Sequence, residues 1–102
     1  MSTNPAKMPG IRVITVRDVE ATGDPTAVDR YVIDSSDSGG LIAVVEHALA
    51  PRVLAAPIHK HSREDEYSLV LDGRLGVVQD GDEVVAEPGQ LVFKPRGHWH
   101  TF

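Results

Sequence analysis

Turn-forming residues divide the second half of the chain into short alternating segments, and this feature limits the fold more than any other. Strands of roughly five residues, with a turn signal roughly every 8–12 positions, are typical of an all-β sandwich or barrel. Because Asp-Gly between two alternating segments favours a hairpin, we expect residues 67–71 and 74–79 to pair. The other expected strands are 83–86, 91–94 and 98–102, separated by turns at Asp80-Gly81, Pro88-Gly89 and Pro95-Arg96-Gly97.

The first half of the chain carries weaker signals. We expect a loop over residues 18–29 and, around it, strands at 11–17, 31–33, 41–47 and, less regularly, 53–59. Residues 1–10 hold two Pro, a Gly and an Asn, which predicts a disordered tail. Residues 11–102 then form a single domain, because the chain contains no linker-like break.

Composition excludes several classes of function. The net charge of -5 argues against a nucleic-acid surface, which needs a basic stripe. The absence of Cys excludes disulfides and thiolate metal ligands. No apolar run approaches the roughly 20 residues of a membrane span, and residues 1–10 lack a signal peptide's apolar stretch. We therefore expect a cytoplasmic protein without nucleic-acid or membrane partners.

His59 and His61 lie two positions apart in an expected strand. Side chains at that spacing point to the same face, so the two imidazoles suit chelation of one metal ion. The polar run 62–65 predicts a chain reversal, after which Glu66 returns opposite the two histidines.

Alternation along the following strand separates an inner face from an outer one. Glu66, Ser68 and Val70 share the inner face, whereas Glu64 and Asp65 are expected to be solvated turn residues. The outer face, which we expect to pack against an opposite layer, carries Tyr67, Leu69 and Leu71.

Two spacings in the chain resemble the two sequence motifs of the cupin family. The first motif is H-x-H, three or four residues, E, six residues and G, and it is matched by His59, His61, Glu66 and Gly73. The second is G, five residues, P-x-G, two residues and H, and it is matched by Gly89, Pro95, Gly97 and His100. The Asn that follows in the family falls beyond Phe102. The resemblance implies a jelly-roll β-barrel of two antiparallel sheets, in which the motifs meet at a metal.

The resemblance also implies a ligand set. One divalent transition metal, Fe, Mn, Zn, Ni or Cu, is expected to bind to His59, His61, Glu66 and His100. His98 shares the alternation of His100 and could compete, but the spacing from Pro95 and Gly97 favours His100. For His47, lining a cavity and lying on the surface are both open.

Cupins include dioxygenases, isomerases, decarboxylases, storage proteins and binding modules, so the family does not name a reaction. One hypothesis is a dioxygenase-type enzyme acting on a small organic molecule, similar to quercetinase-like cupins, with Glu66 as catalytic base. The alternative is a non-catalytic module that holds a metal and a small ligand. A structural cupin with a degenerate site is disfavoured by the full ligand set. Cations near the motifs either attract an anionic ligand or lie exposed, namely Lys60, Arg63, Lys94 and Arg96.

The last expected strand, 98–102, is short. An unpaired apolar edge is costly and tends to pair with another chain. We therefore expect either a shortened form of a longer protein, with C-terminal strands missing, or a homodimer in which a neighbour's strand 11–17 covers the edge. His100 is expected to be the least firmly held ligand, because its strand lacks support on one side.

Overall fold

The computed structural model describes residues 10–102, which divide into two compact units, one ending at Val53 and the other spanning 54–102. Helical structure in the described residues is limited to two 3-10 turns, η1 (Val16–Asp18) and η2 (Ser35–Ser38). No helix among them is long and apolar enough to span a membrane. The tail predicted for residues 1–10 lies, except for Gly10, outside the described residues.

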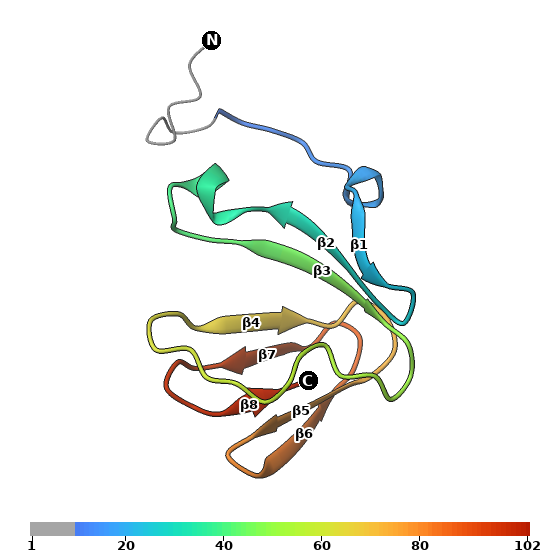
Figure 1. Ribbon diagram of the computed structural model, residues 1–102, viewed down its shortest axis with the longest axis vertical. Coiled ribbons are helices and arrows are strands. Elements are labelled where there is room, and N and C mark those ends of the chain that lie inside the picture. Colours follow the sequence, from blue (N-terminus) through green and yellow to red (C-terminus); the bar gives the residue numbers. More distant parts are fainter. Residues whose placement is uncertain (1–9) are drawn as a thin grey trace. The chain divides into compact units, whose positions relative to one another are not determined.

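The strands form three antiparallel sheets, and within residues 10–102 none of these sheets closes on itself (Figure 1). The all-β prediction is therefore confirmed. Whether residues 11–102 behave as a single domain stays a prediction.

The first unit contains one sheet, in the order β1 (Ala21–Asp24), β2 (Ala27–Ile33) and β3 (Val44–Leu49). Strands β1 and β2 form a hairpin that begins inside residues 18–29, so the prediction of a loop there is wrong, whereas the strand expected at 31–33 is confirmed as the end of β2. The Asp24 carboxylate accepts hydrogen bonds from the backbone N–H (2.7 Å) and the hydroxyl (2.5 Å) of Thr26. Such an Asx turn reverses the chain within a few residues.

Residues 11–17 do not form the expected strand. Most of the segment is irregular, and its end turns into η1. Ile11 and Val13 are fully exposed, which shows that their alternation has no sheet partner among the described residues.

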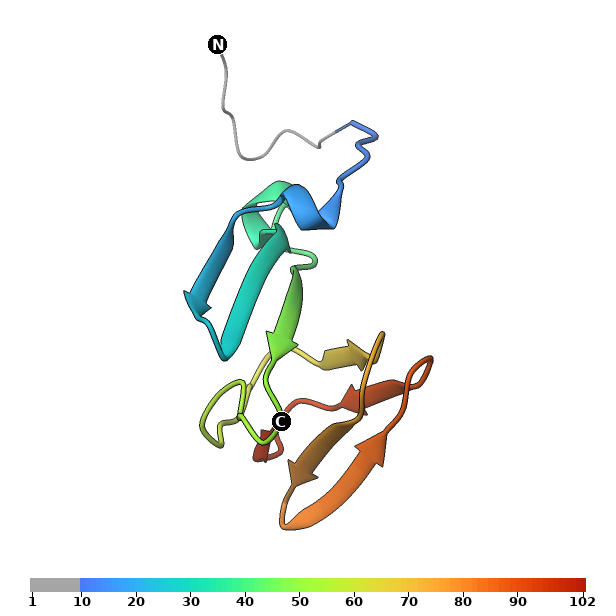
Figure 2. The same cartoon turned by 90° about the vertical axis from the view of Figure 1, so that its right-hand side faces the viewer.

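The second unit contains a two-stranded sheet and a three-stranded sheet (Figure 2). Strand β4 (Glu66–Leu69) pairs with β7 (Leu91–Lys94). The other sheet has the order β6 (Asp82–Ala86), β5 (Leu75–Gln79) and β8 (His100–Thr101). The Asp80-Gly81 turn, with φ of 50° and 86°, closes the β5–β6 hairpin as expected.

The Asp72-Gly73 turn does not close a hairpin, so that prediction is wrong. The backbone of Val70 is already bonded to the β7 side, donating to Gln90 O (3.0 Å) and accepting from Gly89 N (2.8 Å). Since β4 pairs with β7 and β5 belongs to the other sheet, the turn leads the chain from one sheet into the other.

The interior of the second unit combines apolar and polar side chains. Val70, Val77 and Ala86 are buried, together with Lys94 and His100. The expected inner face of β4 is confirmed, since Glu66 and Ser68 are half-buried. No strand within residues 54–102 covers the outer face, so its packing against an opposite layer stays a prediction. The exposed side chains of this outer face are Tyr67, Leu69, Leu71, Leu91 and Phe93.

Candidate metal centre

Two backbone hydrogen bonds place His59 beside His100. The N–H of His59 donates to His100 O (3.0 Å), and the N–H of His100 donates to His59 O (2.8 Å). Residues 53–59 form no strand, so this single bridge positions the first histidine. On its other side, β8 pairs with β5 through Gln79 and Val78. His100 is thus supported on both sides, so the reason for expecting it to be the least firmly held ligand does not hold.

The turns of the two motifs are tied to each other near His61. The N–H of Gly97, which has a φ of 81°, donates to His61 O at 2.7 Å. The Asp65 carboxylate accepts from the backbone N (2.9 Å) and from Nε and Nη2 (both 3.1 Å) of Arg96. These hydrogen bonds from Arg96 lower the pKa of Asp65. Asp65 is therefore a structural residue rather than the solvated one expected.

Glu66 reaches the site through a different pairing from the one expected. It opens β4 opposite Lys94 of β7, whereas His59 pairs with His100. The expected antiparallel pairing of the histidine segment with the Glu66 strand is therefore wrong, although the side chains still meet.

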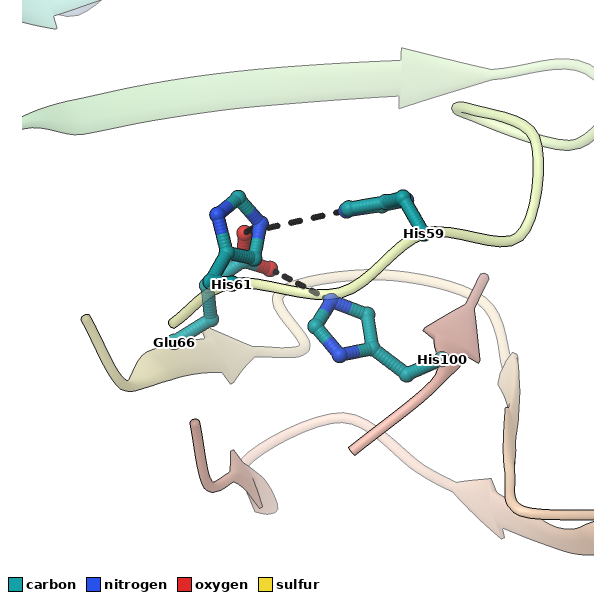
Figure 3. Close-up of side chains that lie close together, drawn as sticks. All are labelled: His59, His61, Glu66 and His100. Atoms are coloured by element: carbon teal, nitrogen blue, oxygen red, sulfur yellow. Dashed lines mark ion pairs between the residues drawn. The ribbon is translucent and has the colours of Figure 1, made fainter. Parts of the chain in front are cut away.

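Four side chains converge in the second unit, as Figure 3 shows. One ligand atom from each of His59, His61, Glu66 and His100 lies within 4.8 Å of the others. Glu66 Oε1 is 2.5 Å from His61 Nε2 and 4.0 Å from His59 Nε2, and Oε2 is 3.3 Å from His100 Nε2. The structure thus brings together all four residues expected as metal ligands.

The donor atoms of this cluster fit a metal ion. Within the described part of the chain, three buried ring nitrogens lack a well-formed hydrogen bond. His61 Nε2 and His100 Nε2 contact the Glu66 carboxylate, and His100 Nδ1 has no hydrogen-bond partner among the described residues. Leaving such a group unsatisfied costs about 1–3 kcal/mol. Metal–nitrogen bonds of about 2.0–2.1 Å place ligands on opposite sides of an ion roughly 4 Å apart. Shifts of under about 1 Å would therefore let one ion bind one ring nitrogen of each histidine, with His61 Nε2 and Glu66 Oε1 moving apart and the longer distances shortening.

The comparison with protein families agrees with this geometry. A family model described as "Cupin domain" matches residues 45–102, more than half of the chain. The chain belongs to the cupin family. No curated protein and no solved structure gives a significant match to it. This cupin therefore carries a histidine and glutamate cluster that could bind a metal, and its fold class agrees with the family.

Lys94 is a member of the site that the sequence did not single out. Its side chain is only 2% exposed. Its Nζ donates to Ser68 Oγ (2.8 Å), lies 3.3 Å from Glu66 Oε2, and sits 3.8 Å from the centre of the Phe102 ring. From the sequence it was one of four cations near the motifs, and only the β4–β7 register shows that it faces Glu66.

Burial and neighbouring charges oppose each other at Glu66. Burial is the largest influence and acts to raise the pKa of the carboxyl. The positive charge of Lys94, the His61 ring, the hydrogen bond from Lys94 and the His100 ring together outweigh burial, so the pKa of Glu66 is lowered. The carboxyl group is therefore ionised at neutral pH, which is the form that binds a cation.

The two buried bases respond mainly to desolvation. Burial lowers the pKa of His100, and the attraction of Glu66 only partly offsets it. Burial likewise lowers the pKa of Lys94, again partly offset by Glu66. A lowered pKa keeps the His100 ring neutral, as metal ligation requires.

The other histidines of this cupin have partners outside the cluster. The side chains of His98 and Asp80 are both exposed, and His98 Nδ1 lies 2.5 Å from Asp80 Oδ2. His47 belongs to β3 in the first unit, where its Nδ1 lies 2.7 Å from Asp29 Oδ1 on β2. Glu64 is mostly exposed, 3.4 Å from His61 Nδ1.

Proposed function

We propose that this cupin is a metal-dependent enzyme of the dioxygenase type that acts on a small organic molecule. Its ligands to one divalent ion are His59, His61, Glu66 and His100. The observation that carries the proposal is the convergence of three imidazoles and one carboxylate, with buried ring nitrogens that lack well-formed hydrogen bonds. Fe, Mn, Zn, Ni and Cu all accept this ligand set.

A bound metal would supply Lewis-acid or, for iron and copper, redox chemistry to a substrate held beside it. The protein's own contribution falls mainly to Glu66, the carboxylate of the cluster. It is ionised at neutral pH, which is the form that a base requires. We therefore assign Glu66 two roles: it would hold the metal and, when released from it, act as the catalytic base.

The test begins with the metal content of the purified protein. We expect about one iron or copper ion per chain and, with a panel of flavonols, diketones and thiols, oxygen uptake that matches loss of one substrate class. The matched control is His61→Ala, which should lose both the metal and the oxygen uptake. Absence of bound metal from the native protein after loading would contradict the proposal.

A non-catalytic module that holds a metal and a small ligand is the second candidate. The contacts of Lys94 with Ser68, Glu66 and Phe102 favour it, because they engage the ammonium within the protein. Besides its histidines, the four-residue cluster then offers a catalytic reaction one proton acceptor, Glu66. Metal binding and saturable ligand binding without oxygen uptake would support this module over the enzyme.

A further inference from the structure

The contacts of Lys94 indicate that it acts on Glu66 and not on a substrate. An ammonium group has three N–H donors. Lys94 has three partners for them: Ser68 Oγ, Glu66 Oε2 and the face of the Phe102 ring. With its side chain 2% exposed, the ammonium is held in place by the protein itself.

An apolar side chain would fill this position at lower cost. Removing an ammonium from water is expensive unless it is paired and hydrogen-bonded. A methionine has a similar length and no charge to desolvate. The positive charge of Lys94 therefore has an electrostatic role, and the charge it faces is that of Glu66.

The two oxygens of Glu66 have different surroundings. Oε1 lies toward the two histidines of the first motif, 2.5 Å from His61 Nε2 and 4.0 Å from His59 Nε2. Oε2 lies 3.3 Å from Lys94 Nζ and 3.3 Å from His100 Nε2. A carboxylate that bound a metal through both oxygens would have to share Oε2 with the ammonium, and the cation would repel the metal there.

We propose that Lys94 is a positioning residue that restricts Glu66 to a single metal-binding oxygen, Oε1. This inference rests on the proposed metal site. Since Oε2 stays with Lys94, one further coordination position remains open to a small-molecule ligand. Ser68 has a supporting role, because it anchors the ammonium from the same inner face of β4.

The experiment uses the full chain loaded with Co²⁺, whose visible spectrum reports its coordination, and imidazole as an uncharged probe of open positions. In Lys94→Met, Oε2 is released and competes for the open position. We expect a weaker absorption per bound Co²⁺, as for a higher coordination number, and about 10–100-fold weaker imidazole binding. Ser68→Ala should shift both readouts in the same direction by less.

Two controls separate this role from loss of charge or of folding. Lys60→Met removes the same charge from a lysine that lies over the Trp99 ring, and should leave imidazole affinity unchanged. In a Glu66→Gln background the side chain has only one carboxamide oxygen, so adding Lys94→Met should change nothing further. Measuring absorption per bound ion excludes effects of partial unfolding.

Each outcome decides a specific point. Equal spectra and equal imidazole affinities for the native protein and Lys94→Met would overturn the role of Lys94 while leaving the metal site intact. Failure of the native protein to bind Co²⁺ would overturn the proposed function and this inference together. Binding of Co²⁺ without any response to imidazole would exclude the open position, and with it the inference.

Discussion

Lys94 lies opposite Glu66 in the β4–β7 register, with its Nζ 3.3 Å from Glu66 Oε2. Both side chains point to the inner face, where His100 is also buried. Charges in partly buried surroundings are screened less by salt than exposed charges. The ion pair therefore orients the carboxylate before any ligand arrives, and several predictions about the histidines and Glu66 depend on that arrangement.

Replacing His61 with Ala should remove most of the bound metal. His61 contributes a buried nitrogen that faces the Glu66 carboxylate, and loss of one ligand leaves an incomplete set. The control is His98→Ala, because His98 is exposed and faces Asp80. Metal content is measured by mass spectrometry after dialysis. Full occupancy of His61→Ala combined with loss in His98→Ala would show that the ligand assignment is wrong.

Replacing Glu66 with Gln should reduce activity more than metal binding. The amide oxygen still offers a ligand, but the amide cannot accept the proton, so turnover should fall by roughly 10²–10⁴. Glu64→Gln is the matched control, since Glu64 is mostly exposed. Steady-state rates are compared with metal content for both variants. Equal proportional losses of turnover and of bound metal in Glu66→Gln would show that Glu66 is a ligand without a role as base.

Local sequence signals predicted much of the second unit but not its strand partners. The strands at 83–86, observed as 82–86, and 91–94 and the Asp80-Gly81 turn were expected from alternation and turn chemistry. A turn signal shows that the chain reverses, yet it does not show which strand lies alongside. At Asp72-Gly73 the pairing of β4 with β7 overrides the local hairpin preference.

The same reason explains what was missed at the site. The resemblance of the spacings to the cupin motifs predicted that His59, His61, Glu66 and His100 meet. Lys94 enters only through the distant β4–β7 pairing. In the first unit, Gly23 and Asp24 were interpreted as part of a loop, although they form the end of β1 and the turn into β2.

The metal-free protein should lose stability in two stages as the pH falls. Burial lowers the pKa of His100 below 6.5. Below that pH the unfolded chain therefore binds more protons than the folded chain, and the free energy of unfolding decreases. The lowered pKa of Glu66, although burial acts to raise it, adds stability above 4.5 that is lost on further acidification.

Urea denaturation in EDTA, at pH values of about 7.5, 5.5 and 4, measures both stages. The variant His100→Gln should abolish the loss of stability that begins below pH 6.5. The variant His98→Gln should retain that loss, because His98 lies outside the buried cluster. A free energy of unfolding that stays constant from neutral pH to below 6 would contradict the account of His100.

The substitution Val77→Ala should destabilise the second unit. Val77 is 2% exposed on β5, and its loss of two methyl groups plus the remaining cavity should cost roughly 2–3 kcal/mol. The matched control is Val85→Ala on the neighbouring strand β6, where the side chain is exposed and the expected change is within about 0.5 kcal/mol. Equal decreases in the free energy of unfolding for Val77→Ala and Val85→Ala, measured by urea denaturation, would show that Val77 is not a core residue.

The exposed outer face of β4 and β7 predicts self-association. Tyr67 and Phe93 stack there with ring centres 5.2 Å apart, and Leu69 beside them is 58% exposed. A contiguous apolar face of this kind marks an interaction surface, and we expect a homodimer of twice 11.0 kDa.

Light scattering over a range of concentrations measures the mass of the assembly. Leu69→Lys should shift the equilibrium toward monomer, whereas Val85→Lys, an equally apolar and exposed position on β6, should leave it unchanged. A native protein that stays monomeric at every concentration, or a dimer indifferent to Leu69→Lys, would show that this face does not join two copies.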